Sequence, residues 1–560
     1  MTNKNTQNSA QQTQFKLDFN ERSDNQPAWL SQAEIHTDNL WRYPNREQLE
    51  QVLCADLNLP NGALLLTNGG DEGIDLLFKS STINNTQLLI PEPCFSQYSH
   101  NAEVWNNDCC FIQVDPAQPL AINQNQIIEQ LDKDQWLIIT RPNNPTGEFI
   151  GKDILLAFIQ AAQKKQAKVF IDEAYIEFAN PEKNEEMFSA ADYAAMDNVV
   201  VLRTFSKAFG LAGARVGYLF GNPNLITTFR RLAPPFNVSR VSLQLASQAW
   251  QNRDQVPTYT RQIVDNRQKL TATLNRYGVN DFPSQGNFIL FNTNPAMKTI
   301  LFNVLKRQGI LIKTQLNGLP DAVRMTVPFT IEPLLASLSS IFEPQLLAFD
   351  MDGVLIDTSA SYDQCIIKTV YQLSKEDVTL SDIQTLREAG GYNNDWDLSL
   401  ALLKQHGYSG NLDEVINVFQ AFYLGSSNQA GLIKQERSII STQLIERLQQ
   451  ATTLQTAVVT GRPRSEAKLG LEKINWQPDD LVSADDVSQQ KPSPEGLLSL
   501  KDKLDKNAAA CWFIGDTVDD MQAGRAAGFI CIGISADAAL LLNAGADVVL
   551  DNINQLESLL

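Results

Sequence analysis

Two short stretches of this chain place reactive side chains directly after apolar runs. In TFSKAFGLAGARVGY, Lys207 follows a predicted strand, and Arg215 lies eight residues later among glycine and alanine. In AFDMDGVLIDT, Asp350 and Asp352 flank Met351 at the end of another apolar run. An amine can bond a carbonyl carbon, and a carboxylate can attack phosphorus. The sequence therefore predicts two reactive centres with different chemistry.

Small residues around Lys207 let the backbone approach a ligand closely, and Ser206 and Arg215 offer donors to a phosphate. Lys207 can then form a Schiff base with a cofactor aldehyde. A lone Ser-Lys pair is more commonly part of a flexible surface loop, so this hypothesis depends on partners elsewhere in the chain.

Partners of the right chemical type follow other predicted strands. FIDEAYIEF places Asp172 at a strand end with Tyr175 three residues later, and RPNNPTGEF places Asn144 after another strand. A pyridoxal phosphate ring needs a carboxylate against its pyridinium nitrogen and donors at its phenolic oxygen. TNGGDEGIDLL adds a glycine turn that opens a helix, where free amides favour phosphate. Singly, Asp172 can be a helix cap and Asn144 part of a turn; together they indicate a pyridoxal phosphate site.

Residues 15–343 resemble fold-type I, class I/II aminotransferases, and among them the histidinol-phosphate aminotransferases, on the motifs RYP, GGDEGI, DEAYIEF and TFSKAFGLAGAR. The resemblance implies that Lys207 holds the cofactor and that Asp172 pairs with its ring nitrogen. It assigns the remaining contacts as follows: Asn144 and Tyr175 to the phenolic oxygen, Gly70, Asp71, Ser206 and Arg215 to the phosphate, and Arg324 with Asn20 and Asn287 to the anionic end of the substrate. It also implies a homodimer, in which Tyr43 reaches the neighbouring subunit's cofactor phosphate.

The chain departs from this family pattern at two positions. Phe95 stands where relatives usually have a tyrosine that stacks on the cofactor, so the ring face remains and a hydroxyl is lost. Lys313 stands where relatives often have arginine, so the charge remains without the bidentate fork. The resemblance therefore favours transamination more firmly than it favours an imidazole substrate.

Asp350 and Asp352 belong to a second set of polar residues. Side chains at i and i+2 of a strand can face one pocket, where one carboxylate attacks phosphorus and the other moves a proton to the leaving oxygen, provided that a metal offsets the negative charge. A lone DxD pair is more commonly a solvated turn. Further segments strengthen the hypothesis: TAVVTGRP supplies Thr460, QQKPSPEG supplies Lys491, and CWFIGDTVDDMQAGRAAG ends a third strand in Asp516 and Asp520, which can bind Mg²⁺ through oxygen.

This second set resembles the phosphatase-like branch of the haloacid dehalogenase superfamily, close to the phosphoglycolate phosphatases, over about residues 346–560. The resemblance implies that Asp350 is the nucleophile and forms an aspartyl-phosphate, and that Asp352 is the general acid and base. It implies a Mg²⁺ ion bound by Asp350, the main-chain carbonyl of Asp352 and Asp516, with Asp520 orienting the site. Residues 361–435 are expected to form a helical cap over a Rossmann-like core.

The elements that must position these residues follow from the pattern of the chain. Apolar or β-branched runs alternate with helical patterns from Leu88 onward, which predicts an α/β architecture with a mainly parallel sheet and functional groups at the carboxyl ends of strands. IEPLLASLSSIFEPQ is typical of a closing helix before the next strand. The sequence therefore predicts a disordered tail (1–14), an aminotransferase domain (15–343) and a phosphatase domain (344–560).

Composition limits the partners. The 560 residues carry a net charge of −19, which argues against nucleic acid or an anionic membrane surface as a partner. No apolar run approaches the roughly 20 residues of a membrane helix, and seven scattered cysteines favour a cytoplasmic protein with reduced thiols. His36, His100 and His406 are too dispersed to form a metal cluster and are expected to be structural or surface residues.

The pairing of the two halves suggests consecutive reactions on one small molecule. The first would transfer an amino group between glutamate (or 2-oxoglutarate) and imidazole-acetol phosphate, and the second would release phosphate from the histidinol phosphate formed, because tethering raises the local concentration of a shared intermediate. Other possibilities are a different amino-phosphate substrate, a decarboxylase similar to the threonine-phosphate decarboxylases, or one half that is catalytically silent and regulatory.

Overall fold

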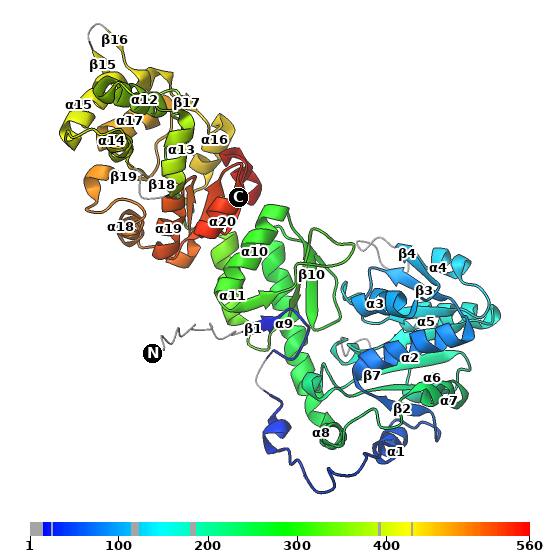
Figure 1. Cartoon of the computed structure of the whole chain (residues 1–560). Helices are drawn as coiled ribbons and strands as arrows, with labels where there is room; N and C mark the ends of the chain where they lie inside the picture. The colour runs from blue at the N-terminus through cyan, green and yellow to red at the C-terminus, as the bar shows by residue number, and fades with distance from the viewer. Residues whose placement is uncertain (1–14, 24–25, 114–122, 180–185, 390–393, 427–428) are drawn as a thin grey trace. The chain divides into compact units, whose positions relative to one another are not determined.

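The computed structural model (Figure 1) describes residues 15–560 except 24–25, 114–122, 180–185, 390–393 and 427–428. The predicted tail, residues 1–14, lies outside the described residues. The chain forms two compact units, one of Met1–Thr293 with Leu305–Leu335 and the other of Asn294–Val304 with Ala336–Leu560. This division passes through helices α10 (Pro295–Arg307) and α11 (Glu332–Phe342), and the boundary at about Glu343 stays a prediction.

A seven-stranded sheet forms the centre of the first unit. Its strands, in spatial order, are β2 (Leu64–Thr67), β8 (Gly217–Gly221), β7 (Val199–Thr204), β6 (Lys168–Asp172), β5 (Trp136–Thr140), β3 (Leu88–Glu92) and β4 (Cys109–Gln113). The five strands from β7 to β4 run parallel, whereas β8 runs antiparallel to β7 and to β2. The predicted mainly parallel α/β sheet is therefore confirmed.

The central strands are buried on both faces. In β6, Val169 and Ile171 pack into one apolar cluster, whereas Phe170 between them packs into another. Alternating side chains of a strand point to opposite faces, so helices must cover both sides of this sheet. One face is covered by α2 (Gly69–Asn84), α3 (Ser96–Trp105) and α7 (Pro223–Leu232), and the other by α1 (Glu47–Asp56), α5 (Lys152–Lys164), α6 (Ala190–Ala194) and α8 (Arg240–Gln251).

A smaller set of strands carries the predicted substrate residues of this unit. The antiparallel strands lie in the order β12 (Ala322–Thr326), β10 (Phe288–Asn292) and β9 (Asp281–Phe282), and β1 (Phe15–Leu17) pairs in parallel with β11 (Ile310–Ile312). Arg324 lies within β12, Asn287 directly precedes β10, and Asn20 follows β1. Helix α9 (Val256–Arg276) packs against β10.

The second unit contains a six-stranded sheet in which every strand is parallel to its neighbours. The spatial order is β19 (Asp480–Val482), β18 (Gln455–Val459), β13 (Leu346–Phe349), β20 (Cys511–Gly515), β21 (Ile530–Ile534) and β22 (Val548–Leu550). Its helices are α16 (Thr442–Gln450), α17 (Arg464–Lys473), α18 (Glu495–Lys503), α19 (Val518–Ala527) and α20 (Ala538–Ala544). Because β13 lies centrally, its carboxyl end meets those of β18 and β20.

Four helices lie in the interval that the sequence assigns to a cap: α12 (Tyr362–Ser374), α13 (Leu380–Ala389), α14 (Asp395–Gln405) and α15 (Leu412–Tyr423). They share an apolar core of their own, which includes Ile366, Leu402 and Phe419. The chain enters this group through the short strand β14 (Ile356–Asp357) and returns through β17 (Arg437–Ser438), and these two strands pair with each other. The helices are therefore tied to the sheet by a pair of adjacent connections.

Beside the end of β6, one buried carboxylate joins three elements of the first unit. Glu173 is 1% exposed and accepts hydrogen bonds from Tyr193 at 2.7 Å and from Arg141 at 3.3 Å through the same oxygen. Its other oxygen accepts two bonds from Arg203, at 2.7 and 2.9 Å. Since a buried charge is tolerated only when it is paired, this cluster fixes the strand end on which Asp172 lies.

We expect Glu173→Ala to lower the free energy of unfolding of the first unit by about 3–5 kcal/mol, because it leaves buried guanidinium charge without its partner. Chemical denaturation followed by circular dichroism measures the change. The exposed Glu103 of α3 offers a control, and Glu103→Ala should change the free energy of unfolding by less than about 0.5 kcal/mol. Equal midpoints for the two variants would contradict the structural role of Glu173.

Candidate active sites

The first candidate site is built around Asp172, the last residue of β6. Its side chain is buried, accepts a hydrogen bond from the Tyr98 hydroxyl at 2.9 Å and accepts another from the Ala174 backbone at 3.0 Å. Burial raises the pKa of Asp172 to about 6, although the bonds from Ala174 and Tyr98 act in the opposite direction. The carboxylate is therefore held in a fixed orientation and gains from a cation placed beside it.

Tyr98 was not predicted as a site residue. It lies on α3, one helical turn after Phe95, and its ring is fully buried. The segment PEPCFSQY contains both aromatic residues, but its sequence alone does not indicate that the second one reaches Asp172.

The predicted substrate residues form one connected cluster. The Tyr175 hydroxyl accepts hydrogen bonds from Asn20 Nδ2 at 3.2 Å and from Asn144 Nδ2 at 3.4 Å. Arg324 Nη1 donates to Asn144 Oδ1 at 2.6 Å, and Asn287 Nδ2 donates to the Asn20 carbonyl at 3.1 Å. These residues come from five separate segments of the chain, so only folding brings them together.

Lys207 reaches the same cluster. Its Nζ lies 5.5 Å from the centre of the Tyr175 ring and donates to the Phe19 carbonyl at 2.9 Å. Two buried polar atoms nearby, Asn287 Oδ1 and Arg324 Nε, have no hydrogen-bond partner within the described residues. Unpaired polar atoms in a buried site indicate that a polar ligand completes it.

Two of the predicted phosphate residues, Gly70 and Asp71, lie in the first turn of α2. Arg215 Nη2 pairs with Asp71 Oδ2 at 2.5 Å. A Cβ atom on Gly217 would lie 2.9 Å from the Gly70 nitrogen, so this close approach requires glycine. Ser206 is buried, and its Oγ accepts a bond from Thr204 Oγ1 at 2.9 Å. The helix N-terminus with one guanidinium suits a phosphate group.

Three other residues that the sequence singled out are described by contacts other than those with Asp172 or Tyr175. Phe95 is the half-buried residue that precedes α3. Tyr43 is 76% exposed, and its ring stacks on Phe236 with centres 4.2 Å apart. Lys313 exchanges two backbone hydrogen bonds with Arg324, at 2.8 and 3.0 Å, so the two cations lie on adjacent backbone. The roles of Phe95 and Tyr43 stay predictions.

Pyridoxal phosphate fits this set of residues. Asp172 offers a fixed carboxylate to a ring nitrogen, Lys207 offers an amine, and the start of α2 offers phosphate donors. The unpaired atoms of Asn287 and Arg324 leave bonding capacity for the anionic end of a substrate.

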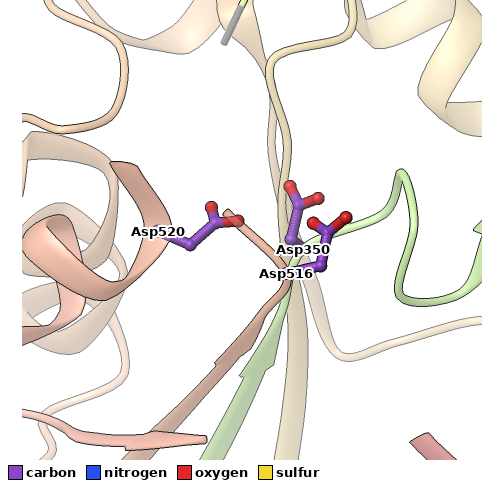
Figure 2. A group of neighbouring side chains, drawn as sticks. All are labelled: Asp350, Asp516 and Asp520. Carbon is purple, nitrogen blue, oxygen red and sulfur yellow. The ribbon is translucent and has the colours of Figure 1, made fainter. Parts of the chain in front are cut away.

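The second candidate site lies at the carboxyl ends of neighbouring strands in the second unit. Asp350, Thr460 and Asp516 directly follow β13, β18 and β20. Figure 2 shows the carboxylates of Asp350 and Asp516 side by side, with Asp520 directed toward them from a helix. The sequence placed Asp520 at a strand end, but the structure places it as the third residue of α19. Thr517 caps this helix, and its hydroxyl donates to Asp520 at 2.7 Å.

One carboxylate oxygen from each of Asp350, Asp516 and Asp520 lies within 4.8 Å of the other two. Burial raises the pKa of Asp350 and of Asp516, and the neighbouring carboxylates raise both further. Asp516 Oδ1 has no hydrogen-bond partner among the described residues. A Cβ on Gly353 would lie 2.0 Å from Asp516 Oδ2, so glycine is needed to let this acid approach. The set fits Mg²⁺, a hard cation that prefers oxygen ligands.

Lys491 brings a positive charge next to two of these acids. Its ammonium contacts Asp350 and lies 2.6 Å from Asp520 Oδ1. Burial opposes the charge on Lys491, but the two carboxylates outweigh burial and raise its pKa. Lys491 is therefore a permanent cation beside the predicted nucleophile.

Asp352 lies apart from the metal triad because its side chain is bound by Arg462, at 2.9 Å from Nε to Oδ1. Thr460 Oγ1 accepts a bond from the Arg462 backbone at 3.1 Å. Sequence reasoning missed Arg462, although it stands in the quoted segment TAVVTGRP.

A pocket of about 320 Å³ opens over the acids and is lined by residues of both the core and the cap helices. From the core come Asp350, Asp352 and Asp516; from the helices come Asp363, Arg387 and Asp395. Arg387 is paired on both sides, at 2.8 Å with Asp363 and at 2.9 Å with Asp395. Arg387 is thus neutralised by its neighbours, and the pocket keeps an excess of negative charge.

Comparison with known proteins agrees with the geometry of the first site. Residues 13–338, more than half of the chain, match the family model of class I and II aminotransferases. The chain belongs to this family. It is 29% identical to the histidinol-phosphate aminotransferase of Bacillus pumilus over 53% of this chain and 80% of that protein, and 30% identical to histidinol-phosphate aminotransferase 2 of Oceanobacillus iheyensis over 51% and 78%.

Solved structures share the fold of the class I and II aminotransferase region. The histidinol-phosphate aminotransferase of Clostridium acetobutylicum superposes with a TM-score of 0.53 at 23% identity, over 59% of this chain and 99% of that one. The enzyme from Sinorhizobium meliloti, solved with pyridoxal-5'-phosphate, gives a TM-score of 0.51 at 20% identity, over 59% of this chain and 91% of that one. The fold-type I architecture is therefore confirmed, and pyridoxal phosphate is the cofactor of the aminotransferase region.

Residues 344–528 match the family model of haloacid dehalogenase-like hydrolases. The predicted resemblance of this region is thereby confirmed, and Mg²⁺ is the metal that its acids suit. Among the residues that the structure describes, no helix has the length and apolar character needed to cross a membrane.

The affinity of the aminotransferase region for pyridoxal phosphate should fall as the pH drops below about 6. The free enzyme holds Asp172 with a pKa of about 6, so acid protonates the carboxylate that must pair with the ring nitrogen. Titration of apoenzyme with the cofactor, followed by absorbance between pH 5 and pH 8, measures the effect. Asp172→Asn should bind more weakly and lose part of this pH dependence; equal slopes in both proteins would contradict the assignment.

Adding Mg²⁺ should raise the melting temperature of the hydrolase region, because the metal relieves repulsion among Asp350, Asp516 and Asp520. Asp516→Asn should reduce this increase strongly, since it removes a charged ligand without changing size. Differential scanning calorimetry with and without the metal measures both. Asp502→Asn, which alters an exposed aspartate of α18, should keep the full increase. An undiminished increase in Asp516→Asn would place the metal elsewhere.

Proposed function

We propose that this chain is a bifunctional enzyme of histidine biosynthesis. Its aminotransferase region transfers an amino group from glutamate to imidazole-acetol phosphate and forms histidinol phosphate, and its hydrolase region then removes the phosphate. The observation that carries the proposal is the presence of both complete residue sets in one chain, together with relatives that are named histidinol-phosphate aminotransferases.

In the first reaction, pyridoxal phosphate, when bound, supplies the electron sink that makes the substrate Cα acidic. Asp172 would pair with the ring nitrogen of the cofactor, and Tyr98 fixes the orientation of that carboxylate. Lys207 takes a proton from the carbon that bears the amino group of glutamate. In the second half of the reaction it gives a proton to the carbon that bears the new amino group of histidinol phosphate. Arg324 binds the anionic end of each substrate with its unpaired Nε.

In the second reaction, Asp350 attacks phosphorus and forms an aspartyl-phosphate while the bond to the leaving oxygen breaks. Asp352 gives a proton to that oxygen and later takes one from the attacking water. Lys491 and the Thr460 hydroxyl stabilise the charge on the phosphoryl oxygens. Mg²⁺, when bound by Asp350 and Asp516 with Asp520 close by, offsets the repulsion between carboxylate and phosphate.

The charge of the second pocket supports an amine-bearing substrate. Arg387 is paired with Asp363 and Asp395, so the cap side presents two carboxylates and one guanidinium. Such a surface attracts an ammonium group and repels a second carboxylate. Histidinol phosphate carries a primary amine and no carboxylate, so it suits this pocket better than a phosphorylated carboxylic acid does.

The Lys313 position leaves room for a different amino-phosphate as the substrate of the first reaction, because a lysine cannot bind phosphate with a bidentate fork. A homodimer in which Tyr43 completes the neighbouring site, and a cytoplasmic location, remain predictions. Both are typical of enzymes that act on small phosphorylated metabolites.

The two activities should separate by mutation. Lys207→Ala should remove the visible cofactor absorbance and reduce transamination by at least about a thousandfold, but it should leave phosphate release from histidinol phosphate unchanged. Asp350→Asn should have the opposite effect. A coupled assay follows 2-oxoglutarate and inorganic phosphate with imidazole-acetol phosphate, histidinol phosphate and other amino-phosphates as substrates. If wild-type protein releases no phosphate from any amino-phosphate, the second half of the proposal is wrong.

A further inference from the structure

Asp352, which serves as the proton donor in the proposed hydrolysis, shares its carboxylate between the pocket and a buried arginine. Arg462 Nε lies 2.9 Å from Asp352 Oδ1 and 3.1 Å from Oδ2, and Nη2 also contacts Oδ1. The Arg462 side chain is 1% exposed, whereas that of Asp352 is 31% exposed. Asp352 therefore has one side open to a substrate and the other bound to a fixed cation.

Residues at the ends of the cap bind the same guanidinium through Nη1 and Nη2. Nη2 donates to Glu436 Oε1 at 3.0 Å, and Nη1 donates to the Tyr423 hydroxyl at 3.2 Å. Glu436 is 3% exposed and also accepts bonds from Tyr423 at 3.0 Å and from Ser361 at 3.1 Å. Tyr423 is the last residue of α15, and Ser361 precedes α12, so this network spans both ends of the cap helices.

Further contacts tie Arg462 to the cap and to α17. The guanidinium lies 4.9 Å from the centre of the Tyr362 ring, and the Tyr362 hydroxyl donates to Glu466 Oε2 at 2.7 Å. Burial opposes the charge of Arg462, but Asp352 acts together with Tyr362 and Tyr423 to outweigh burial and raise the pKa of Arg462. Arg462 is thus a permanent cation with a buried carboxylate partner behind it and Asp352 in front of it.

A planar guanidinium that binds a carboxylate through two nitrogens fixes both its position and its orientation, which a lysine cannot do. A general acid works only when it lies within hydrogen-bond reach of the leaving oxygen. We infer that Arg462 is a positioning residue for Asp352, and that Glu436 and Tyr423 link this position to the cap. The inference rests on the proposed phosphatase function.

Arg462 acts on Asp352 in both proton transfers of the reaction. When the bond from Asp350 to phosphorus forms and the bond to the leaving oxygen breaks, the proton passes from Asp352 to that oxygen. Asp352 is then a carboxylate, whose charge Arg462 stabilises. When water attacks and the bond from Asp350 to phosphorus breaks, the proton of water passes to Asp352. Arg462 therefore favours proton release in the first half and holds the base in place for the second.

The test compares two leaving groups in the full-length enzyme with Mg²⁺. An alkyl phosphomonoester such as histidinol phosphate releases a strongly basic oxygen and needs the acid, whereas p-nitrophenyl phosphate releases a weakly basic one and needs it little. Asp352→Asn, which removes the general acid, shows how large the difference between the two substrates becomes without it. This variant should lower kcat/KM for histidinol phosphate far more than for p-nitrophenyl phosphate, because kcat/KM excludes the later attack of water that both substrates share.

Arg462→Lys should shift the ratio of the two kcat/KM values in the same direction. We expect about a tenfold to hundredfold loss on histidinol phosphate and about a threefold loss or less on p-nitrophenyl phosphate, because a positioned acid supplies about 10²–10⁴ in rate. Tyr423→Phe keeps the ring and removes one hydroxyl, so it should shift the ratio by about threefold. Tyr371→Phe alters a tyrosine of α12 that is 50% exposed and should leave both rates unchanged.

The possible results distinguish the positioning role of Arg462 from the proposed phosphatase function. An equal loss of kcat/KM on both substrates in Arg462→Lys and Tyr423→Phe would show a purely structural role and overturn the inference, because kcat/KM reports the step in which the leaving group departs. If Arg462→Lys does not fold, as judged by circular dichroism, Tyr423→Phe decides alone. If Asp352→Asn leaves the ratio unchanged, the acid role of Asp352 and the inference are both wrong, while hydrolysis through Asp350 stands. If the wild type hydrolyses neither compound, the proposed phosphatase function itself is wrong.

Discussion

Both candidate sites depend on carboxylates held at or beside the ends of buried strands. Asp172 and Asp350 are 7% and 4% exposed, and burial raises the pKa of each. A buried carboxylate is stable as an ion only when cations or donors surround it. Parallel strands place such residues at one edge of a sheet, so the architecture itself creates the need for a bound cation.

The two sites meet this need in different ways. Among the described residues, the hydrogen-bond donors to Asp172 are the neutral Tyr98 hydroxyl and Ala174 amide, so this carboxylate retains its capacity for a positively charged ring nitrogen. Asp350 already contacts the Lys491 ammonium but shares it with Asp520, so the cluster remains net negative and suits a divalent metal. The same constraint thus produces an organic cofactor site in one unit and a metal site in the other.

Arginine has a comparable role behind both sites. Arg203 and Arg141 neutralise Glu173 next to Asp172, and Arg462 lies between Glu436 and Asp352. In each case a guanidinium joins a buried acid to a neighbouring element, so the position of a strand end depends on residues far away in the chain.

The sequence by itself determined which residue types stand at the strand ends. Apolar runs mark the buried strands, and Lys207, Asp172, Asp350 and Asp516 lie at the strand ends or within three residues of them. The α/β class and the chemistry of both centres could therefore be predicted. The antiparallel β8, the helical position of Asp520 and the partners Tyr98 and Arg462 could not. Tyr98 is 74 residues from Asp172, and Arg462 is 110 residues from Asp352. Local patterns specify strands and helices, but only the order of strands in a sheet and the packing of helices decide which distant side chains meet.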